Sequence, residues 1–308
     1  MSFNVLSLDG GGIRGIISIV LLERLSAEPG LAGWIDRVQF LAGTSTGGLI
    51  ALGLSAGKSL GDLRRLYVDD GPHIFADSVF DDIRDLGKLI GADYDVEPLE
   101  QSVRRVLGQK KLGDLAKRVL IATFDLDNGA ADPGTRRWKP KLFHNFPGTD
   151  SDAEALAHEV ALYTSAAPTY FPTVGGFVDG GVFAPNPSMC AVAQTQDRRT
   201  GESVPLSEVR LLSMGTGQSL LRVEGDVHDW GYAQWARPLV DLMLDGVNGI
   251  ADFQCTQILR DRYHRLAPVF PANVRFDMDD AEKIPEMIAF AKGVDIAPAA
   301  AWIRANFF

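Results

Sequence analysis

A serine between two apolar segments is the first residue in this sequence that could do chemistry. Gly43-Thr44-Ser45-Thr46-Gly47 reads G-x-S-x-G and follows the apolar residues Phe40-Leu41-Ala42. This spacing is typical of a serine nucleophile on a sharp turn from a strand into a helix, where Gly43 and Gly47 relieve crowding. A serine hydroxyl is unreactive at neutral pH unless a base takes its proton. The chain must therefore supply a base for Ser45.

Histidine is the usual base for such a serine, but the five histidines have unconvincing settings. They are His73, His144, His158, His228 and His264. His158 falls in a predicted helix and His264 in a predicted strand, whereas His228 lies beside Asp229 in a polar loop and is the best of the five. We interpret them as surface histidines or as core histidines with satisfied hydrogen bonds.

Asp179 is a better candidate for the base. It ends a short apolar stretch in Gly175-Gly176-Phe177-Val178-Asp179-Gly180-Gly181, where Gly180 and Gly181 let other backbone segments approach the carboxylate. The ordinary pKa of an aspartate is about 3.9. Partial burial would raise this pKa and make Asp179 a better proton acceptor. The alternative is a turn aspartate that only accepts hydrogen bonds from backbone amides.

A glycine-rich loop follows the first predicted strand. Gly10-Gly11-Gly12-Ile13-Arg14-Gly15 fits the dinucleotide fingerprint G-x-G-x-x-G. That fingerprint requires an acidic residue at the end of the second strand, which here ends in Gly43-Thr44-Ser45. We therefore favour an oxyanion hole made by the amides of Gly10, Gly11 and Gly12 together with that of Thr46. Arg14 would add positive charge or hold the loop; a tight structural turn is the alternative.

Strands and helices alternate along the chain. Strands are predicted at 3–8, 38–42, 118–124, 141–144, 176–178, 209–214 and 263–269, and helices at 13–26, 46–56, 152–165, 187–196, 230–260, 281–292 and 297–306. This alternation predicts an α/β fold with a mainly parallel sheet. Sites in such sheets form beyond the carboxyl ends of strands, where the glycine loop, the serine turn and Asp179 all fall.

Composition narrows the classes of function. The net charge of −10 argues against broad attraction to nucleic acid or to anionic lipid. The two cysteines, Cys190 and Cys255, form no C-x-x-C pair, so we expect reduced thiols and no metal site. No stretch reaches 18 uninterrupted apolar residues, and the first residues do not resemble a signal peptide. We expect a cytoplasmic protein that is able to act peripherally at membranes.

Taken together, the motifs resemble those of the patatin-like phospholipase family. The matching residues are Asp9-Gly10-Gly11-Gly12-Ile13-Arg14-Gly15, Gly43-Thr44-Ser45-Thr46-Gly47, Asp179-Gly180-Gly181, Asn186-Pro187 and Leu212-Ser213-Met214-Gly215-Thr216-Gly217. The resemblance implies a three-layer α/β/α domain over residues 1–308 and a Ser45–Asp179 dyad. It also implies an oxyanion hole at Gly10–Gly12 with Arg14 nearby, no metal and no organic cofactor. The implied reaction is hydrolysis of acyl esters of phospholipids through an acyl-enzyme.

Several features leave the choice of substrate open. Residues 60–115, with Phe75, Val79 and Phe80, are expected to be helical and to form a lid or ordinary packing. Residues 270–308 form a helical C-terminal segment, whose final Phe307-Phe308 we expect to dock on the core. The basic run Arg136–Lys141 contains Trp138 and could touch an anionic membrane or remain a solvated loop. The alternative function is a carboxylesterase or acyltransferase on smaller or neutral lipid esters. Oligomeric state cannot be predicted.

Overall fold

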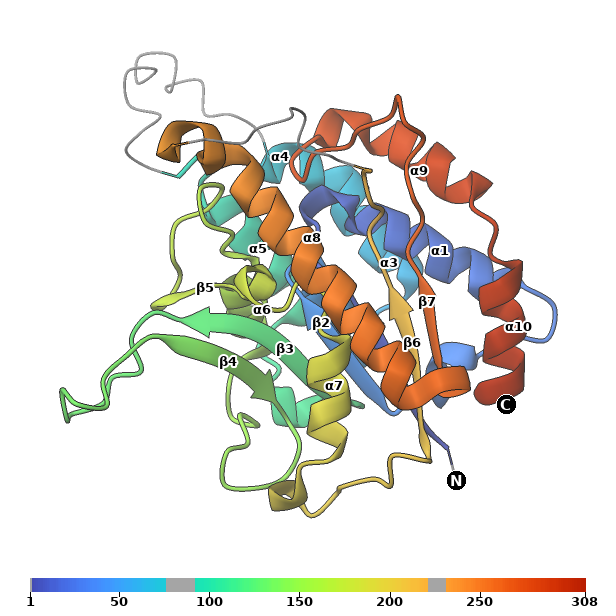
Figure 1. Ribbon diagram of the computed structural model, residues 1–308, viewed down its shortest axis with the longest axis horizontal. Helices are drawn as coiled ribbons and strands as arrows, with labels where there is room; N and C mark the ends of the chain where they lie inside the picture. The colour runs from blue at the N-terminus through green and yellow to red at the C-terminus, as the bar shows by residue number, and fades with distance from the viewer. Residues whose placement is uncertain (1, 76–91, 221–230) are drawn as a thin grey trace.

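A seven-stranded sheet crosses the part of the chain that the computed structural model describes, residues 2–75, 92–220 and 231–308 (Figure 1). The strand order is β4-β3-β2-β1-β6-β7, and β5 pairs with β3. β1, β2, β3, β6 and β7 run parallel, whereas β4 and β5 run antiparallel to β3. The strands are β1 (Phe3–Leu8), β2 (Phe40–Thr44), β3 (Arg118–Asp125), β4 (Lys139–His144), β5 (Phe177–Asp179), β6 (Val209–Met214) and β7 (Tyr263–Leu266).

Helices cover both faces of the sheet, with α7 and α8 in front of it in Figure 1 and α1, α3 and α9 behind it. The helices are α1 (Gly15–Ala27), α2 (Thr46–Ser55), α3 (Leu60–Arg65), α4 (Gly71–Ile74), α5 (Glu97–Leu107), α6 (Ala157–Ser165), α7 (Ser188–Thr195), α8 (Tyr232–Leu259), α9 (Ile284–Gly293) and α10 (Ala297–Asn306). Short 3-10 turns are η1 (Gly12–Arg14), η2 (Trp34–Arg37), η5 (Leu112–Asp114), η6 (Gly180–Val182), η7 (Arg198–Thr200), η8 (Arg260–Arg262) and η9 (Ala281–Lys283), and η3 (Leu66–Asp70) is a π-helix. Of the described helices, none is both long and apolar enough to cross a bilayer.

Side chains alternate between the two faces of the sheet, as the two-residue period of a strand requires. In β1, Val5 packs in the cluster that contains Cys255 of α8, while Leu6 packs in the cluster that contains Ile16 and Ile17 of α1. All five side chains are fully buried. Because both faces are covered, the central strands are mainly apolar, with a few polar residues such as Asn4 and Ser7 in β1. This arrangement confirms the predicted α/β fold with a mainly parallel sheet between helical layers.

The predicted elements occur in the predicted order, but five helices, α1, α6, α7, α8 and α9, start one to five residues later than expected. α6 begins at Ala157 because the Asp152 carboxylate accepts a hydrogen bond from the N–H of His144 at 3.1 Å and keeps the preceding residues in a turn. α7 begins at Ser188, whose N–H donates to Oδ1 of Asn186 at 3.0 Å. Side-chain hydrogen bonds of this local kind compete with helix formation, so they move a helix start without changing the fold.

The segment from 60 to 115 is helical in its described parts, as predicted, and contains α3, η3, α4 and α5. The Phe75 ring lies 5.4 Å from that of Tyr94 and 5.8 Å from that of Phe171, measured between ring centroids. Val79 and Phe80, which we expected over the acyl pocket, lie outside the described residues. A lid at 60–115 therefore stays a prediction.

The C-terminal helix α10 docks on the core, as expected. Phe307 is 2% exposed, and its ring lies 5.3 Å from Trp302 and 6.1 Å from Trp34. The next residue behaves differently, since Phe308 is 51% exposed and the Arg37 guanidinium lies over its ring, 4.2 Å from the ring centroid. The same side chain is thus buried at Phe307 and half-exposed at Phe308.

This contrast predicts unequal costs of truncation. Phe307→Ala should lower the free energy of unfolding by about 3–5 kcal/mol, because it removes a buried aromatic ring and leaves a cavity. Phe308→Ala should lower it by less than about 1 kcal/mol. Urea unfolding of both variants measures the difference. Equal and small effects would show that the C-terminus contributes no packing.

Candidate active site

Ser45 occupies a sharp turn between β2 and α2. Its φ of 53° and ψ of −126° lie outside the conformations that a side-chain-bearing residue usually adopts, and such strain is concentrated at functional sites. The flanking glycines allow the turn. A Cβ on Gly43 would lie 2.3 Å from the carbonyl oxygen of Gly47, and one on Gly47 would lie 2.1 Å from that of Leu8. The predicted strand–turn–helix around Ser45 is therefore present.

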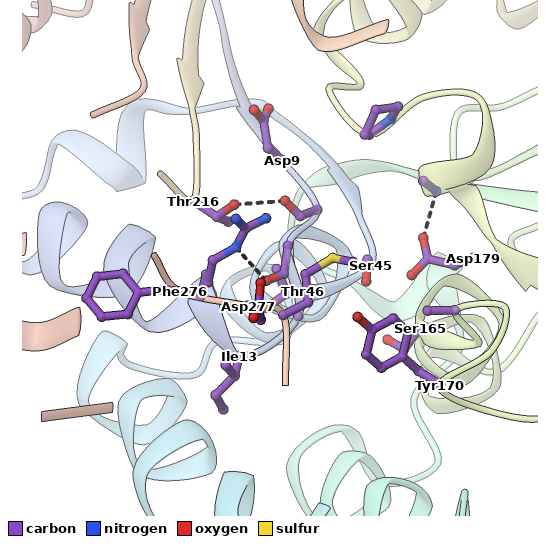
Figure 2. A pocket seen from close by; sticks show the side chains of 18 of the residues that line it. Asp9, Ile13, Ser45, Thr46, Ser165, Tyr170, Asp179, Thr216, Phe276 and Asp277 are labelled. Carbon is purple, nitrogen blue, oxygen red and sulfur yellow. Dashed lines mark hydrogen bonds between the residues drawn. The ribbon is translucent and has the colours of Figure 1, made fainter. Parts of the chain in front are cut away.

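Asp179 reaches Ser45 because two strands share one edge of β3. The last pair between β2 and β3 is Thr44 with Ala122, and the next residue of β3, Thr123, pairs with Asp179 of β5. The turn at Ser45 therefore begins at the point along β3 where pairing with β2 ends and pairing with β5 begins. Figure 2 shows the side chains of Ser45 and Asp179 next to each other on one side of a cavity.

The Asp179 carboxylate is buried, with 5% of the residue exposed. Burial raises the pKa of Asp179 to about 6, although the Ser45 hydroxyl and a hydrogen bond from the N–H of Gly181, 2.7 Å from Oδ1, act to lower it. Gly180 permits the turn, because a Cβ there would lie 2.3 Å from the carbonyl oxygen of Ala122. Asp179 therefore titrates closer to neutral pH than an ordinary aspartate does.

The glycine loop lies against two later segments of the chain. A Cβ on Gly11 would lie 2.2 Å from Oγ1 of Thr216, and one on Gly12 would lie 2.2 Å from the carbonyl oxygen of Met278. Both glycines have positive φ angles, 155° and 57°. Glycine is required at both positions for two reasons, backbone conformation and close approach.

The loop amides differ in what they bind. The N–H of Gly10 donates to the carbonyl of Pro185 at 2.9 Å, so it is not a free donor in this conformation. For the N–H groups of Gly11 and Gly12, no hydrogen-bond acceptor is found among the described residues. Nε of Arg14 donates to the carbonyl of Gly11 at 3.3 Å, so Arg14 holds the loop, which was one of its two predicted roles.

Tyr67 braces the residue after the nucleophile, a contact that no sequence motif indicated. Its hydroxyl forms hydrogen bonds with both Oγ1 and the carbonyl oxygen of Thr46. Both residues are buried, and burial raises the pKa of the Tyr67 phenol. Tyr67 comes from the π-helix η3, a rare conformation that often occurs at functional sites.

The buried Asp9 forms an ion pair with the half-buried Arg265 beside the glycine loop, a contact that no local motif predicted. Nη2 of Arg265 lies 2.6 Å from Oδ2 of Asp9, and its Nη1 donates to Oγ of Ser213 at 2.7 Å. Burial disfavours the charge on Arg265, but the Asp9 carboxylate outweighs this effect and raises the pKa of the guanidinium. The pair connects the end of β1 to β7 and so fixes the base of the loop.

A cavity of about 950 Å³ opens over these residues. Ser45, Asp179 and the Gly10–Gly12 loop lie in its wall (Figure 2). The rest of the wall is largely apolar and includes Ile13, Leu49, Leu66, Ile74, Phe75, Leu99, Phe171 and Phe276. A few polar side chains also line it, among them Arg14, Thr216, Gln218, Arg275 and Asp277. Such a cavity suits a ligand with an apolar chain and a polar end.

Each of the four described histidines lies outside the cavity wall. Nδ1 of His158 bonds to the carbonyl of Gly108 at 2.9 Å, and the His264 ring stacks on Trp302 at 5.9 Å. His144 is buried beside Asp150, and His73 is exposed on α4. His228 lies outside the described residues. Within the described ranges, no cluster of three His, Cys, Asp or Glu side chains could hold a metal ion.

Comparison with known proteins is consistent with this geometry. A sequence model of the patatin-like phospholipase family matches residues 6–191, a stretch that contains the glycine loop, Ser45 and Asp179. The chain belongs to the patatin-like phospholipase family. It is therefore a lipid acyl hydrolase, as the motif resemblance implied.

Individual relatives of this patatin-like chain come from bacteria and plants. It is 35% identical to a cGAMP-activated phospholipase of Vibrio cholerae, over 69% of this chain and 63% of the relative. It is 29% identical to patatin-like protein 2 of Arabidopsis thaliana, over 83% and 72%. Among solved structures, the type III effector ExoU has a TM-score of 0.44 at 12% identity, over 100% of this chain and 54% of ExoU.

The raised pKa of Asp179 predicts how the stability of this patatin-like protein depends on pH. The folded-state pKa of about 6 exceeds the ordinary value of 3.8, so Asp179 stabilises the fold fully below the lower value and loses this contribution as the pH rises through the higher one. The free energy of unfolding of the wild type minus that of Asp179→Asn should increase by about 2 kcal/mol from pH ~7.5 to pH ~4.5. Urea unfolding at both pH values tests this, and a constant difference would contradict it.

Proposed function

We propose that the chain is a phospholipase A-type enzyme that cleaves acyl esters of phospholipids through an acyl-enzyme on Ser45, with Asp179 as the base. The observation that supports this most directly is the adjacency of a strained serine turn and a buried aspartate on one edge of β3. Both residues face a cavity whose wall is largely apolar. The four described histidines lie outside that wall.

Acylation begins when Oγ of Ser45 attacks the ester carbonyl carbon and its proton passes to the Asp179 carboxylate. A pKa of about 6 makes Asp179 a stronger base than an ordinary aspartate and leaves it mostly ionised at neutral pH. The developing oxyanion accepts hydrogen bonds from backbone amides, which we assign to Gly11, Gly12 and Thr46. We do not assign Gly10 as a donor, because its own N–H is bonded to the carbonyl of Pro185.

The second half of the cycle reverses these proton movements. The bond from the carbonyl carbon to the alcohol oxygen breaks, and the alcohol leaves with the proton that Asp179 holds. Water then attacks the acyl-enzyme while Asp179 accepts its proton, and that proton returns to Oγ of Ser45 as the fatty acid departs. The loss of one oxyanion donor in such a cycle costs about 100- to 1000-fold in rate.

The cavity favours a long acyl chain over a small ester. Leu49, Leu66 and Phe75 belong to its apolar wall, and its volume of about 950 Å³ is large for a short-chain substrate. The alternative remains a carboxylesterase or acyltransferase on neutral or small lipid esters. A panel of phospholipids, neutral glycerides and short-chain esters separates the two, because negligible release of fatty acid from every phospholipid would favour the alternative. A nucleotide-binding role for Gly10–Gly15 is the weaker alternative, because the second strand ends in Gly43-Thr44-Ser45 with no acidic residue for a ribose.

Transient contact with a membrane surface is part of the proposal. Trp138 is 70% exposed just before β4, and Arg137 and Lys139 flank it. An exposed tryptophan between cations suits the interface of a bilayer. The free cysteines Cys190 and Cys255 are compatible with the reducing cytoplasm, where we place the protein.

A fluorophosphonate probe should label Ser45 and no other serine, because it reacts only with an activated serine hydroxyl. Peptide mapping by mass spectrometry identifies the labelled residue. Ser45→Ala should abolish both labelling and release of fatty acid while the protein remains folded. Labelling elsewhere, or none in the folded wild type, would remove Ser45 as the nucleophile.

The identity of the base can be tested by pH dependence. With a soluble ester, kcat/KM should fall about tenfold per pH unit below the Asp179 pKa of about 6, because only the ionised carboxylate accepts the proton. Asp179→Asn should reduce kcat/KM by at least ~1000-fold, since a general base of this kind supplies up to about 10⁴. His264→Ala and His228→Ala are the controls and should stay within about threefold of the wild type. A histidine variant that is inactive beside an active Asp179→Asn would reverse the assignment.

A further inference from the structure

Thr164, the penultimate residue of α6, bonds directly to the nucleophile turn. Its hydroxyl accepts a hydrogen bond from the N–H of Ser45 at 2.8 Å and donates one to the carbonyl of Ala122 at 2.6 Å. Thr164 is 0% exposed, so no water competes for these bonds at the surface. One hydroxyl therefore joins three elements: the turn after β2, the end of α6 and the middle of β3.

The position of this hydroxyl follows from the end of the β2–β3 ladder. Thr44 and Ala122 are the last paired residues, and Ser45 then turns away with a positive φ. The N–H of Ser45 and the carbonyl of Ala122 would be left without strand partners at this point, and an unpaired buried backbone group is costly. Thr164 supplies both partners and so bridges the two strands beyond their last pair.

The same region of α6 and β3 also holds Asp179. Thr123, which follows Ala122, pairs with Asp179, and the N–H of Asp179 donates to the carbonyl of Ala166 at 2.9 Å. Two residues of one short segment, Thr164 and Ala166, thus bind the backbone of Ser45 and of Asp179 respectively. A shift of this segment would change the separation of the two side chains.

We propose that Thr164 is a positioning residue that sets the geometry between Ser45 and Asp179. It acts through the backbone of Ser45 and does not touch the substrate, since it is absent from the cavity wall. The inference rests on the proposed roles of Ser45 and Asp179. Misplacement of a reacting group by about 1 Å can cost about 100-fold in rate, so a single hydrogen bond at the turn has a large effect on activity.

Thr164→Val tests this, because valine keeps the shape and removes the hydroxyl. We expect kcat to fall about 10- to 100-fold with KM within about twofold, since the acyl-binding wall is unchanged. The rate of fluorophosphonate labelling of Ser45 should fall by a similar factor. Thr164→Ser, which retains the hydroxyl, should restore both rates to within a few fold of the wild type.

Thr195→Val is the matched control. Thr195 is 1% exposed, and its hydroxyl also makes two hydrogen bonds, donating to the carbonyl of Val192 at 2.7 Å and accepting from Nε2 of Gln196 at 2.8 Å. It lies in α7, outside the cavity wall. Both valine variants should lower the melting temperature, but only Thr164→Val should slow labelling and turnover well below that temperature.

Two results would overturn the inference: full kcat and labelling in Thr164→Val, or equal damage in Thr164→Ser, which would assign the effect to the packing of this side chain and not to its hydroxyl. If Thr164→Val does not fold, Thr164→Cys carries the same test, because a thiol is a weak donor and acceptor. Failure of the proposed function is a separate outcome, seen as a wild type that neither labels at Ser45 nor depends on Asp179.

Discussion

The edge of β3 that faces β2 is the constraint on which the site depends. β2 pairs with this edge as far as Ala122, and β5 pairs with it from Thr123 onward. β2 must therefore leave the sheet at Ser45, and β5 must deliver Asp179 at the next residue. Because the two strands approach from opposite directions, they meet end to end, and the nucleophile and its proposed base become neighbours without a long connecting loop.

Several polar groups in this buried place have hydrogen-bond or ion-pair partners, which offset the cost of removing them from water. Asp9 is paired with Arg265, Thr46 with Tyr67, and the N–H of Ser45 with Thr164. Burial nevertheless raises the pKa of two carboxyls at the site, that of Asp9 beside Arg265 and that of Asp179 with its hydrogen bond from Gly181. A raised pKa makes a carboxylate a better proton acceptor and disfavours its charged form in the folded state, so the ionised carboxylate of Asp179 lowers the stability of the fold.

The site extends beyond the segment that matches the family. Residues 6–191 carry the glycine loop, Ser45 and Asp179. Thr216, Arg265 and Met278 come from later in the chain, and they contact Gly11, Asp9 and Gly12 respectively. The C-terminal third therefore packs against the glycine loop, and it contributes polar groups such as Arg275 and Asp277 to the cavity wall.

Local patterns in the sequence determined the elements and the motifs. Apolar runs followed by glycine predicted β1, β2 and the serine turn, because positive φ angles and close backbone approach both require glycine. The same patterns predicted that Asp179 ends a strand and that the loop with Gly10 and Arg14 follows one. It could not show that the N–H of Gly10 is bonded to Pro185, or that Thr164, Tyr67 and Arg265 complete the site. These contacts join residues between 21 and 256 positions apart, and only the packing of the folded chain brings them together.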